Sequence, residues 1–188
     1  MVIALLGASG SGKSEIEKIL SSKYRYKKIV SYTTRQPRNG EVYGKDYYFV
    51  SYEQFITSLT CDVFAEYDEY SQNRLYGTAK EDYKDNKDKV VVLTPNGLRQ
   101  LKKNIPDINI FSVFVNSNLG TRVKRYIDRC GVDKFNFDDK NEICARVERD
   151  YGMFLGLDNE VDLVVNNNEE TDLNRVVEDI IKWVNRRK

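Results

Sequence analysis

The stretch "VIALLGASGSGKS" (residues 2–14) decides the fold of this chain. Its first five residues form a continuous apolar run, which is typical of a parallel strand buried on both faces. The run ends at Gly7, and residues 7–14 then have the spacing G-x-x-x-x-G-K-S, with a helical pattern over residues 13–22. A strand, this glycine-rich loop and a helix in direct succession are the context that a phosphate-binding loop, or P-loop, requires.

The loop is suited to the phosphates of a nucleoside triphosphate. Its glycines allow a tight turn whose backbone N–H groups point inward, and the start of the helix adds a partial positive charge. Lys13 has the length to reach the β- and γ-phosphates, and the Ser14 hydroxyl can ligate Mg²⁺. We therefore expect ATP with Mg²⁺ to be bound by Gly7, Ala8, Ser9, Gly10, Ser11, Gly12, Lys13 and Ser14, with Ser14 as the metal ligand.

Beyond the loop, short apolar runs alternate with helical patterns. This alternation predicts an α/β fold of the P-loop NTPase type, with a parallel sheet flanked by helices. The last helical pattern has its apolar residues, from Val176 to Val184, on one face. We expect strands at 90–93, 110–115 and 161–165, and helices at 95–103, 118–129, 141–155 and 171–187.

Composition limits the classes of function. The 188 residues are enough for one compact core, and 30 basic against 29 acidic residues leave a net charge of +1. That balance argues against broad binding to nucleic acid or to an anionic membrane. No apolar run approaches the length of about 18 residues that a membrane span needs, and the N-terminal run lacks the basic region of a signal peptide.

The chain contains no histidine, which excludes Ser–His and Cys–His mechanisms and the usual mixed zinc ligands. Chemistry in this protein must therefore depend on positioning and charge. Cys61, Cys130 and Cys144 are irregularly spaced, and we interpret them as reduced thiols of a cytoplasmic protein. The sequence leaves the oligomeric state open.

Two regions interrupt the alternation of strands and helices. Residues 30–77 are rich in tyrosine, glycine and polar residues, and we expect a small β-rich insertion there in place of a helical crossover. Residues 130–141, "CGVDKFNFDDKN", are polar and lie between two helical patterns, as a mobile flap would.

The insertion opens with "SYTTRQPRNGEVYGKDYYFVSYEQF" (31–55), which contains the long pattern S-x-T-T-R-x-P-R-x-G-E-x-x-G-x-D-Y-x-F. Together with the N-terminal P-loop, this stretch resembles the guanylate kinase family. The resemblance covers most of the chain and is densest in residues 1–80. It implies a single domain over residues 1–188, made of a core (1–30, 78–125 and 150–188), an acceptor-binding lobe (31–77) and a flap (about 126–149).

The same stretch has the chemistry to hold a phosphate monoester. Arg35 and Arg38 lie on one bend set by Pro37, so their guanidinium groups can grip a phosphate with forked hydrogen bonds. By resemblance, the hydroxyls of Tyr47 and Tyr76 complete this acceptor phosphate site. We interpret the neighbouring Tyr43 and Tyr48 as packed scaffold.

The resemblance implies that the base of GMP is read further along the chain. Glu66 in "FAEY" (64–67) matches the family's glutamate, whose carboxylate can accept from both N1–H and the amino group of guanine. Ser31 matches a serine near the guanine carbonyl oxygen. Thr78 stands where the family usually has serine, and either hydroxyl can donate a hydrogen bond.

By the same resemblance, arginines that border the flap fold over the donor phosphates. The best matches are Arg125, Arg129 and Arg146, and Asn166 matches a position near the adenine of ATP. Such arginines would spread the charge that builds on the transferred phosphoryl group. We assign the catalytic roles to Lys13, Arg38, Arg129 and Arg146, and further ATP contacts to Arg125 and Asn166.

One stretch departs from the family pattern. In "VVVLTPNG" (90–97) the family has two acidic residues that help to organise Mg²⁺ and contact the acceptor base, and here these positions hold Val92 and Thr94. Either nucleotide binding is kept and turnover is lost, or activity is kept with Mg²⁺ held by Ser14, the triphosphate and water. We favour retained activity, since the rest of the machinery is present.

The resemblance thus implies transfer of a phosphoryl group from ATP to GMP or dGMP, giving GDP or dGDP and ADP. Two alternatives stay open at this point. The chain could be a guanylate-kinase-like binding module with little turnover, although the complete Lys13–Ser14 loop argues against that. It could also be a kinase with another monophosphate acceptor, marked by Val92 and Thr94.

Overall fold

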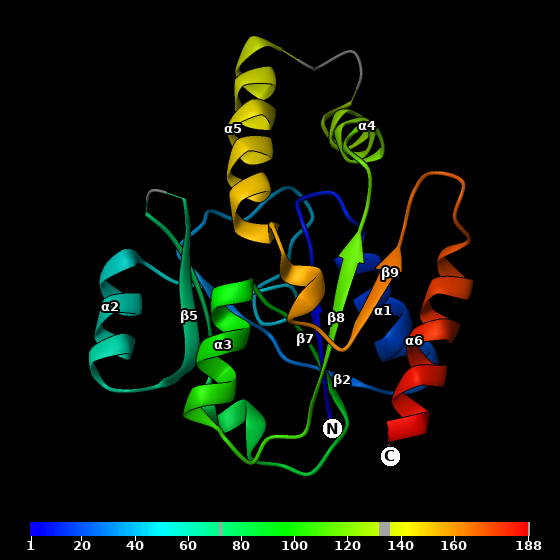
Figure 1. The fold of residues 1–188 in the computed structure, drawn as a ribbon. Coiled ribbons are helices and arrows are strands. Elements are labelled where there is room, and N and C mark those ends of the chain that lie inside the picture. Colours follow the sequence, from blue (N-terminus) through cyan, green and yellow to red (C-terminus); the bar gives the residue numbers. More distant parts are fainter. Residues whose placement is uncertain (72, 132–135, 188) are drawn as a thin grey trace.

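The computed structural model describes residues 1–71, 73–131 and 136–187. Its centre is a parallel sheet with the strand order β2-β7-β1-β8-β9 (Figure 1). The predicted parallel α/β fold is therefore confirmed, and each expected strand is present to within two residues at either end. The strands are β1 (Val2–Leu6), β2 (Lys27–Lys28), β7 (Lys89–Val92), β8 (Ile110–Asn116) and β9 (Leu163–Asn166).

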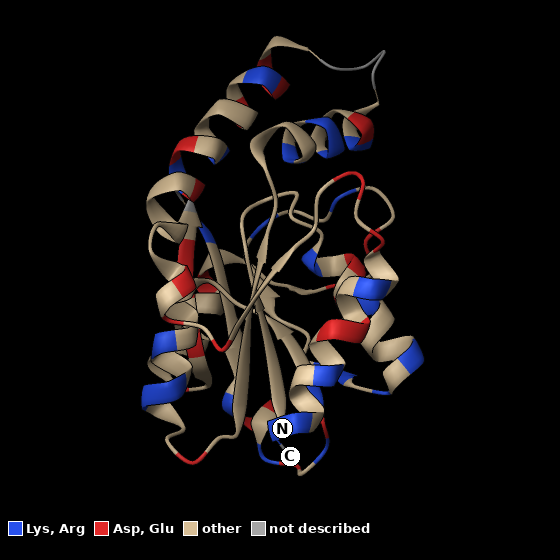
Figure 2. Ribbon diagram, turned by 45° about the vertical axis from the view of Figure 1, so that its right-hand side comes forward, with Lys and Arg blue, Asp and Glu red and all other residues tan. Residues whose placement is uncertain are grey.

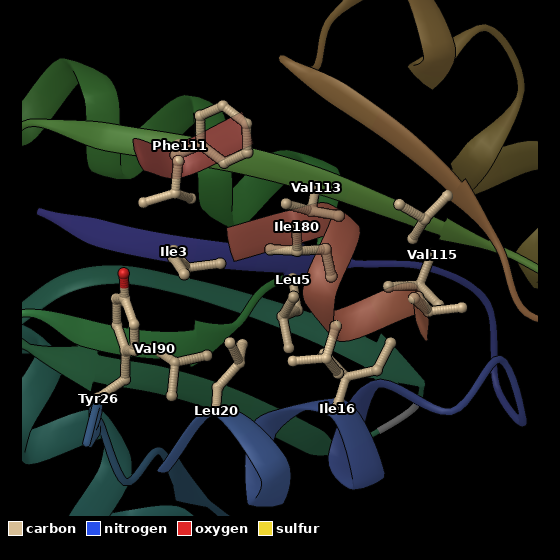
Figure 3. Packing of buried hydrophobic residues seen from close by; sticks show 14 residues of the cluster. Ile3, Leu5, Ile16, Leu20, Tyr26, Val90, Phe111, Val113, Val115 and Ile180 are labelled. Atoms are coloured by element: carbon tan, nitrogen blue, oxygen red, sulfur yellow. The ribbon is translucent and has the colours of Figure 1, made fainter. Parts of the chain in front are cut away.

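Helices cover both faces of this sheet, which explains the continuous apolar run in β1. Side chains alternate along a strand, so Ile3 and Leu5 pack on one side with Ile180 of the C-terminal helix (Figure 3), while Ala4 and Leu6 pack on the other. The first face is covered by α1 (Lys13–Tyr24) and α6 (Leu173–Arg187), and the second by α3 (Pro95–Asn104) and the short helix η3 (Leu157–Asn159).

The predicted β-rich insertion forms a second sheet with the order β4-β3-β6-β5. The expectation of strand pieces alone was incomplete, because the insertion also contains helix α2 (Tyr52–Thr60). A capping box between Ser51 and Gln54 starts this helix, and its Phe55 is fully buried among Phe64 and Leu75. The strands are β3 (Tyr32–Thr33), β4 (Tyr48–Phe49), β5 (Phe64–Ser71) and β6 (Arg74–Ala79), followed by the short helix η1 (Lys80–Tyr83).

Two helices, α4 (Leu119–Cys130) and α5 (Phe137–Phe154), rise above the carboxyl ends of the central strands (Figure 1). Helix α5 starts four residues earlier than expected, because Asn136 and Asp139 form a capping box at its first turn. Of the expected flap at 130–141, residues 132–135 lie outside the described residues, and most of the remainder is helix.

None of the helices in the described part of the chain is long and apolar enough to cross a membrane.

Candidate active site

A cavity of about 200 Å³ is lined by residues from the P-loop, from the end of β7, from the second sheet and from helices α4 and α5. From the P-loop it is lined by Gly7, Ser9, Gly10, Lys13 and Ser14. The remaining predicted loop residues, Ala8, Ser11 and Gly12, belong to the same turn but are not among the residues that line the cavity.

The glycines of the P-loop are required by space as well as by conformation. Gly12, which precedes α1, has a φ of 96°, and a Cβ built on it would lie 2.2 Å from Asn167 Nδ2. A Cβ on Gly7 would lie 2.5 Å from the Val115 carbonyl oxygen. The loop is thus packed tightly against the ends of β8 and β9, which fixes the direction of its N–H groups.

Lys13 is folded back onto its own loop. Its Nζ donates to the carbonyl oxygens of Gly7 (2.6 Å) and Ala8 (2.9 Å). Burial lowers the pKa of the Lys13 ammonium group to about 8, and the nearby Asp150 carboxylate only partly offsets this. A triphosphate entering the cavity would therefore meet a desolvated cation at the foot of the loop.

Asp150 of α5 is a site residue that the sequence reading missed. The side chain is buried, with 2% of the residue exposed, and its carboxylate accepts from Ser9 N (2.8 Å) and from Tyr70 Oη (2.7 Å). It also pairs with Arg122 of α4 at 3.2 Å, and the Tyr70 hydroxyl lies 2.9 Å from Ser9 Oγ. Asp150 and Tyr70 therefore join the P-loop, the second sheet and helices α4 and α5 at one point.

Two predicted ATP contacts lie away from the cavity. Arg125 Nη1 donates to the carbonyl oxygens of Gly10 and Asn167, both at 3.1 Å, so Arg125 supports the loop from behind. Asn166 is exposed and its side chain accepts from Asn116. The asparagine that contacts the P-loop is the next residue, Asn167, whose Nδ2 donates to the Ser11 carbonyl oxygen at 2.8 Å.

On the opposite wall, the cavity is lined by Ser31, Arg35, Arg38, Tyr47, Glu66 and Tyr76, as predicted. Thr78 completes the predicted set one layer further out, behind Glu66. The residues of the predicted acceptor site are therefore brought together, although they come from five separate segments of the chain.

Glu41, which the site prediction did not include, positions the two arginines of the predicted acceptor phosphate site, Arg35 and Arg38. Arg35 is buried and makes a forked pair with both Glu41 oxygens at 2.9 Å, while its guanidinium lies over the Tyr47 ring at 5.2 Å. Glu41 also accepts from the backbone N–H of Arg38 at 2.7 Å. Although burial acts to raise the pKa of the Glu41 carboxyl, these hydrogen bonds hold it below its ordinary value.

Four guanidinium groups converge on this part of the cavity. Burial lowers the pKa of Arg38, and the charges of Arg35, Arg129 and Arg146 lower it further. Arg129 and Arg146 reach the cavity from α4 and α5, where both lie over the Tyr126 ring. Figure 2 shows Lys and Arg on these helices above the strand ends. A phosphate placed among the arginines would relieve their mutual repulsion.

One end of the cavity is lined by the buried carboxyl group of Glu66. Glu66 is 5% exposed, and its Oε1 accepts from Thr78 Oγ1 at 2.7 Å. The Thr78 hydroxyl is in turn 2.8 Å from Tyr83 Oη. Burial raises the pKa of the Glu66 carboxyl to about 7. A group that offers N–H donors to this carboxylate would restore its ordinary ionisation.

The interpretation of Tyr43 as packed scaffold was wrong. Tyr43 is 65% exposed, next to the turn residue Gly44, and its ring meets the Tyr48 ring edge-on with centroids 5.6 Å apart. Tyr48 is half-buried and packs against Tyr32 with ring centroids 4.7 Å apart, as a scaffold residue should.

Val92 and Thr94 both line the cavity, so the departure from the family pattern lies in the site itself. A carboxylate is nevertheless present there, because Asp68 of β5 accepts from Thr94 Oγ1 at 2.5 Å. The sequence reading missed Asp68. The one signal available was its spacing of two from Glu66, which puts both side chains on the same face of a strand.

The donor set suits Mg²⁺ held mainly by its nucleotide. Ser14 offers a hydroxyl oxygen at the cavity wall, and among the described residues there is no group of three or more His, Cys, Asp or Glu that could hold a metal ion on its own. Mg²⁺ keeps several waters and is commonly bound by few protein ligands together with phosphates.

Cys61, Cys130 and Cys144 are free thiols, and Cys61 and Cys144 are exposed.

The fold and this cavity define a P-loop nucleotide-binding protein in which a second sheet carries an opposing, arginine-rich wall. The family model for guanylate kinase matches residues 1–184. The chain therefore belongs to the guanylate kinase family.

Individual relatives agree with this assignment. The chain is 30% identical to a guanylate kinase of Lactobacillus acidophilus, over 98% of this chain and 96% of that one, and 35% identical to one of Wolinella succinogenes, over 80% and 69%. Against the guanylate kinases of Lactobacillus johnsonii and Lactobacillus delbrueckii, the matched part spans 55% of the relative's length. A crystal structure of guanylate kinase from Anaplasma phagocytophilum shares the fold, with a TM-score of 0.72 at 22% identity, covering 99% of this chain and 85% of that one.

Proposed function

We propose that this protein is an active guanylate kinase that transfers the γ-phosphoryl group of ATP to GMP or dGMP, giving GDP or dGDP and ADP. The observation that carries the proposal is the polarity of one cavity. Lys13 of the P-loop and the arginines of the second sheet and helices α4 and α5 supply positive charge, and the buried Glu66 supplies a carboxylate beyond them. A nucleoside monophosphate has the matching polarity, an anionic phosphate and a base with N–H donors.

The roles of the side chains follow from their positions. The P-loop N–H groups and Lys13 hold the β- and γ-phosphates, while Arg35 and Arg38 hold the acceptor phosphate. Arg129 and Arg146 approach the gap between the two phosphate sites and spread the charge of the transferred group. Mg²⁺ bound to the triphosphate and Ser14 would neutralise part of the phosphate charge. Because the chain has no histidine, positioning and charge carry the transfer, with no covalent intermediate.

Glu66 gives the site its preference for guanine. Its carboxylate accepts from N1–H and the amino group together, whereas the N1 of adenine is an acceptor and would face the carboxylate unfavourably. Because Glu66 is buried, a base that left it unpaired would bear the full cost of its desolvation. We therefore expect GMP or dGMP to be strongly preferred over AMP.

Within the proposal, the acceptor-binding lobe (31–77) and the flap (about 126–149) close on their substrates to exclude water. We place the enzyme in the cytoplasm, in keeping with its free thiols. A binding module without turnover is disfavoured by the complete P-loop, in which Lys13 and Ser14 both reach the cavity.

The direct test is to incubate the purified protein with ATP, Mg²⁺ and, separately, GMP, dGMP, IMP, AMP, CMP and UMP, and to follow ADP formation. We expect turnover with GMP and dGMP well above that with AMP and the pyrimidine nucleotides. ATP binding without ADP formation from any acceptor would overturn the proposed enzyme. Turnover with AMP or a pyrimidine nucleotide in preference to GMP would overturn the role of Glu66.

A further inference from the structure

The carboxylate of Asp68 lies in the middle of the cavity wall formed by β5. Glu66, Asp68 and Tyr70 are spaced by two, and all three line the cavity. Tyr70 contacts Ser9 of the P-loop at one end of this row, and Glu66 occupies the buried pocket at the other. Asp68 therefore stands next to the pocket of Glu66, between Glu66 and the tyrosine that contacts the P-loop.

Two donors from the start of α3 hold this carboxylate in place. Thr94 Oγ1 donates to Asp68 Oδ2 at 2.5 Å, and Asn96 Nδ2 donates to Oδ1 at 3.1 Å. Each carboxylate oxygen has two lone pairs, so both oxygens keep an acceptor position for a ligand. The partial positive charge at the start of α3 further stabilises an anion at this point.

Glu66 and the threonine that holds Asp68 both lie close to Gly97 of α3. A Cβ built on Gly97 would lie 2.4 Å from Glu66 Oε2 and 3.3 Å from Thr94 Oγ1, the atom that holds Asp68. Burial is the main cause of the raised pKa of the Glu66 carboxyl, and the nearby charge of Asp68 raises it further. The base pocket is thus bordered by a pair of carboxylates.

We propose that Asp68 is a second base-recognition residue, which accepts a hydrogen bond from the exocyclic amino group of the guanine acceptor beside Glu66. This proposal rests on the proposed function. The guanine edge presents N1–H and two amino hydrogens in a row, and Glu66 can accept only two of these three in one plane. Asp68 supplies an acceptor for the third. Hypoxanthine lacks the amino group, so IMP has nothing to offer Asp68.

This assignment also accounts for Thr94. A carboxylate at position 94 would stand within hydrogen-bonding distance of Asp68 and repel it, whereas the threonine hydroxyl donates to it. The missing acid at 94 and the acid at 68 are therefore one exchange, in which β5 supplies the carboxylate and Thr94, the N-cap of α3, is its positioning residue.

The first experiment compares GMP with IMP as acceptors for the wild type and Asp68→Asn. We expect Asp68→Asn to lower kcat/KM for GMP about 10- to 100-fold, as the loss of a hydrogen bond to a charged group should, and to change kcat/KM for IMP by less than about threefold. Glu69→Gln is the matched control, since Glu69 is exposed on the other face of the same strand, and it should leave both values unchanged. An equal loss for GMP and IMP in Asp68→Asn would overturn the proposal.

A second experiment moves the acid. Asp68→Ala should lose the preference for GMP over IMP, and Asp68→Ala with Thr94→Asp should regain most of it. Thr94→Asp alone should fall below the wild type with GMP, because it brings two carboxylates together. Failure of the double variant to regain the preference, with its thermal unfolding midpoint unchanged, would count against the exchange.

Direct binding separates this proposal from the proposed function. If the wild type turns over no acceptor, the enzyme proposal fails, and calorimetry with GMP and IMP still tests Asp68 by the same comparison of affinities. If the wild type turns over GMP and Asp68→Asn binds GMP and IMP in the wild-type ratio, only the assignment of Asp68 fails.

Discussion

The two walls of the cavity are built in opposite ways. The P-loop wall is one contiguous stretch, residues 7–14, whose shape is set by its own glycines and by close packing against β8 and β9. The acceptor wall is assembled from residues spread between Ser31 and Thr78, which only the pairing of the second sheet brings together. A contiguous motif can be recognised from local chemistry alone, whereas an assembled site depends on topology.

The walls also differ in charge. The P-loop wall holds a desolvated cation, Lys13, whose hydrogen bonds go to the carbonyl groups of its own loop. The acceptor wall holds the buried carboxyl group of Glu66 and the half-buried carboxylate of Asp68, together with the arginines Arg35 and Arg38. Under the proposed function, each wall meets the part of a nucleotide with the opposite charge, and each wall can be tested independently.

The largest expected effect comes from removing one charge from each wall. Lys13→Ala and Arg38→Ala should each lower kcat about 1,000-fold or more, since each removes charge that stabilises the transferred or accepted phosphate. Only Lys13→Ala should also weaken ATP binding, because Arg38 lies on the acceptor side. Steady-state kinetics and calorimetric titration with ATP measure the two effects.

Exposed lysines of the same two regions provide the controls. Lys18, one turn beyond the loop on α1, and Lys45, in the acceptor lobe, are both exposed, and Lys18→Ala and Lys45→Ala should leave kcat within about twofold of the wild type. Equal loss of ATP affinity in Lys13→Ala and Arg38→Ala would contradict the assignment of one wall to each nucleotide.

The next largest effect concerns the junction between the walls. Asp150→Asn should lower the free energy of unfolding by about 3 kcal/mol, because it leaves the half-buried Arg122 without its ion pair and disturbs the bonds from Ser9 and Tyr70. Tyr70→Phe, which removes only the hydroxyl, should cost about 1 kcal/mol. Urea unfolding measures both.

Glu148→Gln is the matched control for Asp150→Asn, because Glu148 is exposed on the same helix, and it should change the unfolding free energy by less than about 0.5 kcal/mol. Wild-type stability in Asp150→Asn would show that the buried carboxylate does not hold α5 to the P-loop.

The difference between the walls explains which residues could be predicted from the sequence. The strands β1, β7, β8 and β9, the helices of the core and the P-loop followed from apolar runs and local spacing, and α6 buries Val176, Val177, Ile180 and Val184 as expected. The two-residue strand β2 was not predicted, because it has no apolar run. The predicted members of the acceptor wall, from Ser31 to Thr78, were found through resemblance to a family, whereas Asp68 in the same wall was missed. Helix α2 was missed because its capping box lies among tyrosines and polar residues typical of strands and turns.

The supporting residues were beyond the reach of sequence reasoning. Asp150 looks like one charge among many in a helix, and only the packing of α5 against the P-loop makes it a partner of Ser9. The hydrogen bond from Thr94 to Asp68 joins the N-cap of α3 to strand β5, two segments that are distant in the sequence. The contact of Asn167 with the P-loop was also missed, since adjacent residues at the end of a strand face opposite ways and only the packing shows which of them meets the loop.

The opposite charges of the walls predict opposite proton linkages. Phosphate binding favours the charged form of Lys13, so ATP binding should take up protons near its free pKa of about 8, and ATP affinity should fall up to about tenfold per pH unit above that. Guanine favours the ionised form of Glu66, so GMP binding should release protons near pH 7, and GMP affinity should rise by up to about tenfold per unit as the pH increases toward 7.

Calorimetry in buffers of different ionisation enthalpy measures both linkages. ATP is best titrated at about pH 8.5, where its own phosphates no longer take up protons. For GMP, whose phosphate also titrates below pH 7, the difference between the wild type and Glu66→Gln isolates the carboxyl. Proton movement of the same sign from Lys13 and Glu66 would remove the electrostatic contrast between the walls.

The smallest expected effect tests whether the hydroxyl group of Thr78 orients the Glu66 carboxylate in the acceptor wall. Thr78 is fully buried and uses its hydroxyl to donate to Glu66 and to meet Tyr83. Thr78→Ser keeps that donor, so kcat/KM for GMP should change by less than about threefold, with about 1 kcal/mol of stability lost with the methyl group. Thr78→Val keeps the shape and removes the donor, so kcat/KM for GMP should fall about tenfold. If serine and valine at this position had the same effect on GMP turnover, Thr78 would act by packing alone, and the orientation of Glu66 would have to come from its burial beside Gly97.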